Sequence, residues 1–206
     1  MLQAKNLTYK YKDEEILSNF NYKFEEGKLY AIIGKSGSGK TTLLSLLSGI
    51  LNIQSGGIIF NNKSIVKEKM RDYRASNSII FQSFNLINYL TPIENVKLAL
   101  EITEVQGNHN DIAQSTLKSV GLTDEQSKRK CRELSGGQQQ RVAIARSLAC
   151  DSKIIFADEP TGNLDPETTI EIIHLLVRLT KEQNKCVICV THDMELKDYA
   201  DRVIKL

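Results

Sequence analysis

The chain has 206 residues, of which 41% are hydrophobic and 25% are charged, a composition typical of one globular domain. The formal net charge of +2 is too small to indicate a nucleic-acid coat or a polybasic membrane tether. No apolar run approaches the ~20 residues that a helix needs to cross a bilayer, and the N-terminus has no apolar core like that of a signal peptide. We therefore expect a protein that forms no pore by itself and stays in the cytoplasm.

The four cysteines do not indicate a disulfide framework in a chain of this size. Cys186 and Cys189 have the spacing of half a zinc site, but residues 185–191 are apolar and β-branched, which predicts a buried strand. Side chains three positions apart on a strand point to opposite faces, so one ion could not easily bind both thiolates. The chain has no second pair at this spacing, and we interpret both cysteines as strand residues.

The predicted elements begin with short β-like runs, separated by polar turns, over residues 1–33. Residues 29–34 form a continuous apolar run that ends in glycine, which predicts a buried parallel strand. A helix is predicted over residues 40–51, because leucines recur on one side of it. Residues 56–65 predict a hairpin, because the asparagines at 61–62 tolerate the positive φ of a tight turn.

From about residue 85 to 150 the pattern becomes mainly helical. One helix is predicted to end near Gly121, and a second to cover about 138–149. Strand patterns return at 153–159 and 185–191, with a helix between them. This alternation predicts an α/β fold with a doubly wound, parallel sheet, into which the helical segment is inserted as a subdomain.

Residues 34–41 match the pattern G-x-x-x-x-G-K-[ST] between an apolar strand and a helix, the context that makes this motif specific. Its glycines allow a tight turn, so that successive N–H groups point at phosphate oxygens at a helix N-terminus. Lys40 then supplies a positive charge for the β- and γ-phosphates, and the Thr41 hydroxyl can ligate Mg²⁺. The alternative is a glycine-rich structural turn, which this context disfavours.

Two carboxylates, Asp158 and Glu159, end the strand predicted at 153–159. Asp158 suits Mg²⁺, held directly or through water, and Glu159 suits a base that polarises the attacking water. Acids also commonly end strands at the surface, so the motif alone leaves both interpretations open. Together with the upstream phosphate loop, it predicts the second half of a nucleoside-triphosphatase site.

A second helix start follows Leu134, where Ser135, Gly137 and Gln138 offer N–H donors and a hydroxyl. An ordinary N-cap with glycines explains this pattern. The alternative is that two copies of the chain face each other, and that each closes the nucleotide site of the other.

Together these motifs resemble the nucleotide-binding subunit of an ATP-binding cassette (ABC) transporter, over nearly the whole chain. The resemblance implies one nucleotide-binding domain over residues 1–206. This domain has a P-loop NTPase core with a mostly parallel sheet, an N-terminal antiparallel β subdomain and the inserted helical subdomain. In this family Gln82 matches the Q-loop glutamine, residues 134–138 the signature, Asp165 the D-loop and His192 the switch histidine.

The resemblance implies that ATP is hydrolysed at two composite sites of a homodimer, with Mg²⁺ as cofactor. Tyr11 falls where the family stacks an aromatic ring on adenine. The residues implied in catalysis are Glu159, His192, Lys40 and Gln82. Those implied in nucleotide binding are Tyr11, Gly34, Ser36, Gly37, Ser38, Gly39, Lys40, Thr41, Thr42, Ser135, Gly137, Gln138 and Asp165. Those implied in holding Mg²⁺ are Thr41, Gln82 and Asp158.

Residues 159–165 and 83–87 resemble one branch, the ATPases of macrolide, lipoprotein and antimicrobial-peptide (bacteriocin) exporters and the cell-division ABC protein. This implies export of a peptide, lipoprotein or hydrophobic compound, an integral membrane permease as partner, and a place on the cytoplasmic face of the membrane. A groove near residues 81–90 would grip a short helix of the permease. The alternative is that Phe84 and its apolar neighbours pack within the helical subdomain. At the C-terminus we expect no regulatory domain.

Two further classes stay open. A regulatory ABC ATPase that gates a membrane partner would use the same residues. Soluble ABC ATPases act on nucleic acid, but they usually carry paired cassettes, zinc modules, coiled coils or long basic linkers, and this sequence shows none. A solvated face explains the basic run at 128–132, so we expect no nucleic-acid partner.

Overall fold

The computed structural model describes residues 1–206, except for the side chain of Lys67. The β-strands are β1 (Leu2–Tyr11), β2 (Glu14–Phe24), β3 (Leu29–Ile33), β4 (Ser55–Phe60), β5 (Lys63–Ser64), β6 (Asn77–Ile80), β7 (Ile154–Asp158), β8 (Cys186–Val190) and β9 (Arg202–Lys205). The α-helices are α1 (Lys40–Leu47), α2 (Met70–Ala75), α3 (Pro92–Ile102), α4 (His109–Ser119), α5 (Gly136–Ala149), α6 (Pro166–Gln183) and α7 (Met194–Tyr199). Short 3₁₀ helices are η1 (Lys67–Lys69), η2 (Gln126–Lys128) and η3 (Cys131–Glu133).

A five-stranded parallel sheet in the order β6-β7-β8-β3-β9 forms the centre of the molecule. Its inner strands are mainly apolar, as expected for strands that are covered on both faces, and β7 ends in Asp158 at the edge of the sheet. On β8, Cys186 and Ile188 face one core, whereas Val187 and Cys189 face the other. The predicted parallel α/β fold is confirmed, and so is the prediction that the two thiols point to opposite faces.

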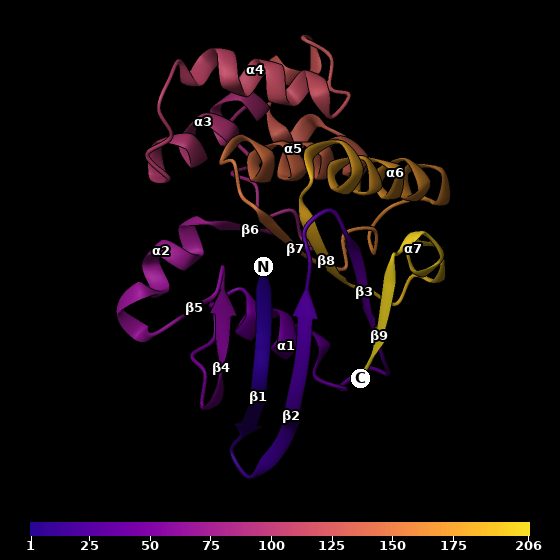
Figure 1. Cartoon of the computed structure of the whole chain (residues 1–206). Helices are drawn as coiled ribbons and strands as arrows, with labels where there is room; N and C mark the ends of the chain where they lie inside the picture. Colours follow the sequence, from indigo (N-terminus) through magenta and orange to yellow (C-terminus); the bar gives the residue numbers. More distant parts are fainter.

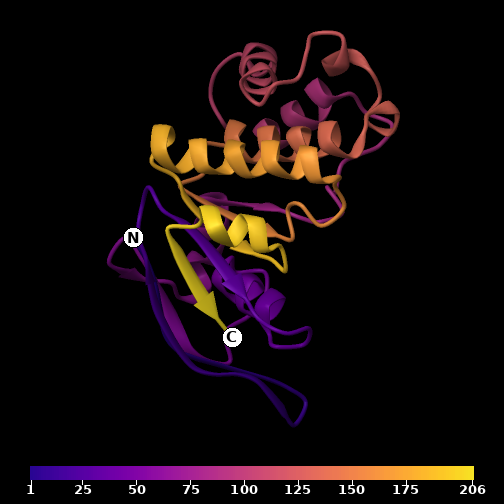
Figure 2. The same cartoon turned by 90° about the vertical axis from the view of Figure 1, so that its right-hand side faces the viewer.

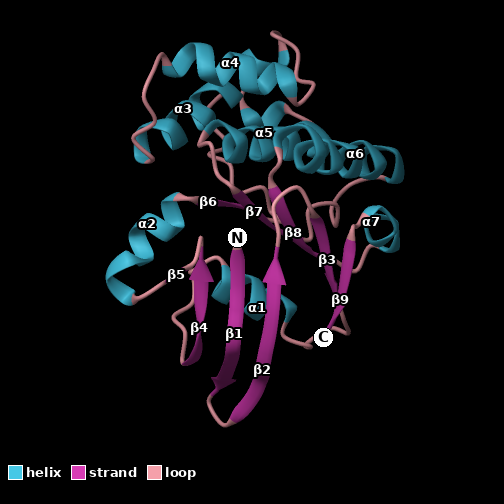
Figure 3. Cartoon of the chain, in the orientation of Figure 1, coloured by secondary structure: helices cyan, strands magenta, loops and turns pink.

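A second sheet, antiparallel in the order β2-β1-β4-β5, lies across α1 from the parallel sheet. In Figures 1 and 3 the long hairpin of β1 and β2 extends down, away from the helices α3–α6. The leucines of α1, at 43, 44, 46 and 47, share one buried cluster with Phe24 of β2, Ile58 of β4 and Phe156 of β7. Helix α1 is thus packed on both sides, and its N-terminus is held rigidly beside the sheet.

The other face of the parallel sheet is covered by α5 and α6, on which α3 and α4 lie as a further layer (Figure 2). Val96 of α3, Leu117 of α4 and Ile144 of α5 belong to the same buried cluster as Ala157 of β7. The inserted helices therefore share their hydrophobic core with the sheet. Whether residues 85–150 act as a separate unit stays a prediction.

Three boundaries differ from the sequence predictions. Helix α1 ends at Leu47 rather than at residue 51, because Gly49 takes φ +78°, which only glycine adopts readily. Helix α5 begins at Gly136 rather than at residue 138, because Ser135 already caps it. The N-terminal strands are long, with 10 residues in β1 and 11 in β2, since register shifts let one strand continue through irregular positions.

Among the residues that the structure describes, no helix is both long and apolar enough to cross a membrane. The carboxyl ends of β3, β7 and β8 lie at one edge of the parallel sheet, because these strands run in the same direction. The phosphate loop follows β3, Asp158 ends β7 and Glu159 follows it, and His192 follows β8. The candidate site is built at this edge.

Candidate nucleotide site

The phosphate loop joins β3 to α1. Gly37 and Gly39 take φ +79° and +88°, a backbone conformation that is strained for residues with a side chain. Gly39 occupies the N-cap position of α1. Lys40 Nζ donates to the carbonyls of Gly34 and Lys35, each at 3.0 Å, so the ammonium lies inside the loop. Ser38 Oγ is buried and, among the described residues, has no hydrogen-bond partner. The hydroxyl packs beside Gly34, and neither Ser38 nor Gly34 lines the cavity described next.

A cavity of about 390 Å³ opens above the start of α1. It brings together the phosphate loop, the acid that follows β7 and the histidine that follows β8. Its lining residues are Ile16, Ser36, Gly37, Gly39, Lys40, Thr41, Thr42, Glu159 and His192. Residues up to 176 positions apart in the chain, Ile16 and His192, therefore face one space.

Thr41 and Asp158 meet at the floor of the site. Thr41 Oγ1 donates to Asp158 Oδ1 at 3.3 Å, across 117 residues of sequence. Burial raises the pKa of the Asp158 carboxyl, while the Thr41 hydroxyl and the charge of Lys40 act in the opposite direction. A hydroxyl and a partly desolvated carboxylate at this separation are the hard oxygen donors that Mg²⁺ prefers, so the residues present fit this ion.

Glu159 and His192 form a second contact, with Oε1 and Nε2 3.3 Å apart. Glu159 takes φ +48°, a left-handed conformation that is uncommon for residues other than glycine. Its N–H donates to the carbonyl of Val190 on β8 at 2.9 Å, which holds the strained backbone in place. Such strain occurs frequently at functional sites, because the surrounding structure must compensate for it.

Gln82 lies beside this pair without lining the cavity. Its side chain and that of Glu159 flank Gly162, whose hypothetical Cβ would lie 2.9 Å from Gln82 Nε2 and 3.3 Å from Glu159 Oε2. The carbonyl of Gln82 accepts from Asn163 Nδ2 at 3.0 Å. The glutamine is thus close enough to Glu159 to act at the same site.

The signature residues lie elsewhere, at the start of α5. Ser135 Oγ accepts from Gln138 N–H at 3.3 Å, and Gln138 Oε1 accepts from Ser135 N–H at 3.0 Å, so the two form a capping box. Gly137 packs so closely on α6 that an added Cβ would meet Thr168 Cγ2. None of the three lines the cavity of its own chain.

Two further residues also lie outside the cavity. Tyr11 ends β1 with 64% of its surface exposed, and its stacking on adenine stays a prediction. The branched residue Ile16, which the sequence analysis did not single out, lines the cavity; its apolar character in a polar hairpin was the available signal. Asp165 caps α6, and both of its oxygens accept from Thr168, at 2.9 and 2.7 Å.

The sequence reasoning also missed Arg146. Its guanidinium donates to the carbonyls of Phe84 and Asn85, at 3.0 and 2.5 Å, and both of these residues have positive φ. Burial lowers the pKa of Arg146. Phe84 itself packs against the core of the helical layer, which supports the packing interpretation of this segment. No pattern along the sequence pairs residue 146 with residues 84–85.

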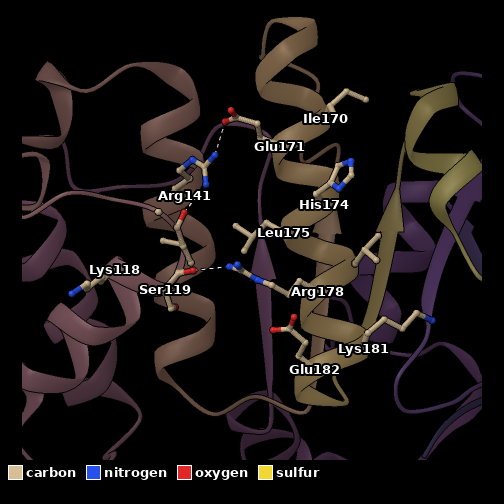
Figure 4. A pocket seen from close by; sticks show the side chains of 13 residues that line it. Lys118, Ser119, Arg141, Ile170, Glu171, His174, Leu175, Arg178, Lys181 and Glu182 are labelled. Atoms are coloured by element: carbon tan, nitrogen blue, oxygen red, sulfur yellow. Dashed lines mark hydrogen bonds and ion pairs between the residues drawn. The ribbon is translucent and has the colours of Figure 1, made fainter.

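A larger cavity, of about 800 Å³, lies between α4, α5 and α6, away from the phosphate loop (Figure 4). Here Arg141 donates to the carbonyl of Val120 and to Glu171, at 2.5 and 2.6 Å, while Arg178 donates to the carbonyl of Ser119 at 2.6 Å. The arginines thus satisfy the free carbonyls at the C-terminus of α4. The nucleotide site is therefore identified by the chemistry of the residues that line the smaller cavity, and not by cavity volume.

A phosphate loop follows the parallel strand β3, and its threonine is bonded to an acid at the end of β7, which is separated from β3 by β8. This arrangement defines a P-loop nucleotide-hydrolysing protein. The chain belongs to the ABC transporter family, whose model matches residues 17–162. It is an ATP-binding subunit and an ATPase of this family, which powers a transporter.

Relatives and solved structures agree. The chain is 42% identical to the uncharacterized ABC transporter ATP-binding protein YclH of Bacillus subtilis, over 96% of this chain and 88% of that protein. It is 42% identical to the lipoprotein-releasing system ATP-binding protein LolD of Rickettsia bellii, over 100% and 95%. The dimeric post-hydrolysis structure of the ATP-binding cassette MJ0796, bound to ADP and Pi, is similar with a TM-score of 0.88 and 37% identity, over 100% and 94%.

Proposed function

We propose that this chain works as a homodimer with two composite ATP sites, docked on an integral membrane permease at the cytoplasmic face of the membrane. The observation that supports ATP hydrolysis at each site is the pair of contacts around one cavity, Thr41 with Asp158 and Glu159 with His192. This arrangement can hold a triphosphate, a divalent cation and an attacking water together.

Each residue has a separate proposed task. The loop N–H groups and Lys40 bind the β- and γ-phosphates, and Thr41 and Asp158 hold Mg²⁺, with Gln82 nearby. Bound Mg²⁺ supplies positive charge that neutralises the phosphates. Glu159 orients the attacking water and accepts its proton, and His192 contacts the γ-phosphate. These tasks together correspond to in-line transfer of the γ-phosphoryl group to water.

The position of the signature residues supports the proposed homodimer. Ser135, Gly137 and Gln138 present a helix N-terminus, yet none of them lines the cavity of the same chain. A helix N-terminus with a free positive end suits an anion, and a second copy placed head to tail would bring it to the γ-phosphate. The dimeric cassettes among the similar structures support this arrangement.

The branch is proposed to be that of exporters of peptides, lipoproteins or hydrophobic compounds. Residues 159–165 and 83–87 carry the resemblance, and the similarity to a lipoprotein-releasing ATPase over 95% of its length supports it. A methionine import protein of Clostridium tetani is 39% identical, so sequence similarity alone does not fix the direction. The permease partner decides between export, import and gating.

Glu159→Gln tests the proposal. The variant is expected to bind ATP normally, to hydrolyse it at least ~100-fold more slowly, the usual scale for loss of a general base, and to accumulate as a dimer. The matched control Glu182→Gln changes an exposed glutamate at the remote cavity and should keep the wild-type rate. Unchanged hydrolysis in Glu159→Gln would refute the role of Glu159.

The same variant identifies the partner. Tagged Glu159→Gln protein is purified from host membranes solubilised in detergent with ATP and Mg²⁺, and the co-purifying proteins are identified by mass spectrometry. Recovery of one polytopic membrane protein supports a transporter or gating subunit, and the sequence of that protein narrows the substrate. Recovery of ribosomal or DNA-associated proteins would refute the membrane proposal.

A further inference from the structure

Two loops meet behind the contact between Glu159 and His192. The first is the turn after β7, in which Gly162 N–H donates to the carbonyl of Glu159 at 3.1 Å. The second is the segment after β8 that leads into α7. They are joined by one side-chain hydrogen bond, in which Thr161 Oγ1 donates to Asp193 Oδ2 at 2.9 Å. Thr161 lies two positions after Glu159 in the chain, and Asp193 directly follows His192.

The carboxylate of Asp193 is held from several sides. Its Oδ1 accepts from Glu195 N–H at 2.8 Å, which makes it the N-cap of α7. Its own N–H donates to Thr191 Oγ1 at 2.8 Å, and the buried Thr191 is in turn bonded to the carbonyl of Ile32 on β3 at 3.1 Å. The backbone on both sides of His192 is therefore fixed to the parallel sheet.

The other side of the link is equally constrained. Thr161 is only 5% exposed, so its hydroxyl has little access to solvent. A buried hydroxyl that lost its acceptor would remain unsatisfied, which favours the bond that the structure contains. The adjacent turn holds Glu159 at φ +48°, a conformation that persists only when its surroundings enforce it.

The pair Glu159 and His192 could not maintain its own geometry. The side chain of His192 is 49% exposed and that of Glu159 is 25% exposed, and ion pairs with such access to water contribute only ~0–1 kcal/mol. The 3.3 Å separation of the two side chains must therefore be set by the loops that carry them. The hydrogen bond between Thr161 and Asp193 directly joins these loops.

We propose that Thr161 and Asp193 are positioning residues for ATP hydrolysis, whose hydrogen bond sets the distance between Glu159 and His192. Neither residue lines the cavity, so they act through the pair and not on ATP itself. This inference rests on the proposed roles of Glu159 and His192. It predicts an effect on turnover that is separate from nucleotide binding.

Thr161→Val tests the inference, because valine keeps the shape of threonine and removes the hydroxyl. It is expected to lower kcat about 10-fold, with KM for ATP changed by less than about twofold, because misplaced catalytic groups slow the chemical step. Thr161→Ser retains a hydroxyl and is expected to keep more than about half of the wild-type kcat. The assay is steady-state ATPase activity of the full chain with Mg²⁺ and ATP.

A matched control separates positioning from lost stability. Thr180 is 1% exposed, and its hydroxyl bonds the carbonyl of Val177 at 2.7 Å, near the C-terminus of α6. Thr180→Val thus removes a buried threonine hydroxyl at another place and is expected to leave kcat unchanged. If both valine variants lose kcat equally, or if the serine variant loses as much as Thr161→Val, the inference is wrong.

The double variant Thr161→Val/His192→Ala gives a second, independent readout. If Thr161 acts through the pair, the double variant has the same kcat as His192→Ala alone. Losses that multiply would overturn the inference. Failure of the proposed function is distinguishable, because it requires that Glu159→Gln hydrolyse ATP at the wild-type rate. An inactive Glu159→Gln beside a fully active Thr161→Val would refute only the positioning role.

Discussion

Replacing Gly137 by alanine tests how closely the signature helix α5 must approach α6. The added Cβ would lie 2.4 Å from Thr168 Cγ2, while ordinary van der Waals contact begins at 3.4 Å. The side chain of Thr168 cannot rotate away without loss, because its hydroxyl donates to Asp165 at 2.7 Å. The two helices must therefore separate by ~1 Å, or the cap of α6 must break.

The expected cost follows from this clash. Overpacking of about 1 Å typically costs ~1–3 kcal/mol, which exceeds the gain of up to ~1 kcal/mol that alanine brings within a helix. For a chain of this length, each kcal/mol lowers Tm by roughly 2–4 °C. Gly137→Ala is therefore expected to lower Tm by several degrees, and to lower ATPase activity because α5 is displaced.

A compensating variant makes the prediction specific. Thr168→Ser removes Cγ2 and keeps the hydroxyl that bonds Asp165, so it should restore most of the stability of Gly137→Ala. Gly136→Ala is the control, since its Cβ would meet Leu164 Cδ2 at an ordinary 3.6 Å. The measurements are thermal and urea unfolding of the wild type, Gly137→Ala, the double variant Gly137→Ala/Thr168→Ser and Gly136→Ala. Equal stability of Gly137→Ala and Gly136→Ala, or no rescue by Thr168→Ser, would refute the reasoning.

Two other predictions concern the catalytic edge. Burial raises the pKa of Asp158, so in the acidic range the folded state binds more protons than the unfolded chain. The free energy of unfolding of the wild type should therefore fall, relative to that of Asp158→Asn, as the pH rises from about 4. Urea unfolding of both proteins near pH 4.5 and 7 checks this, and an equal difference at the two pH values would contradict it. Gly162→Ala places a Cβ 2.9 Å from Gln82 Nε2 and 3.3 Å from Glu159 Oε2, so the ends of both side chains must shift and kcat should fall, by about 10-fold at most. Gly57→Ala, whose Cβ meets nothing within 4 Å, should keep the wild-type kcat, and an unchanged kcat in Gly162→Ala would show that Glu159 tolerates displacement.

The parts of the fold that local patterns encode were predictable from the sequence. The apolar runs at 29–34 and 154–157 indicated buried parallel strands, because a strand that is covered on both faces is apolar on both sides. The asparagines at 61–62 indicated a turn, and both take positive φ there. The phosphate loop at 34–41 was predictable for the same reason, since its function depends on residue types at consecutive positions.

The ends of helices and the contacts of individual side chains were harder to predict from the sequence. The leucine pattern of α1 continues to Leu51, but the backbone conformation at Gly49 ends the helix earlier. Ile16 is a hairpin residue that faces the cavity, and no motif in the sequence marks it. In both cases the path of the backbone, which the local residue pattern does not encode, decides where the residue lies.

The contacts that define the site join residues far apart in the chain. Thr41 meets Asp158 because β3 and β7 both pair with β8, in a register that no local pattern encodes. Thr161 meets Asp193 because the segments after β7 and β8 leave the same edge of the sheet. The chemical role of each site residue could be predicted from its residue type, since each type has its own chemistry. Their separations to within an ångström arise from strand register and helix packing, and these depend on the whole hydrophobic core.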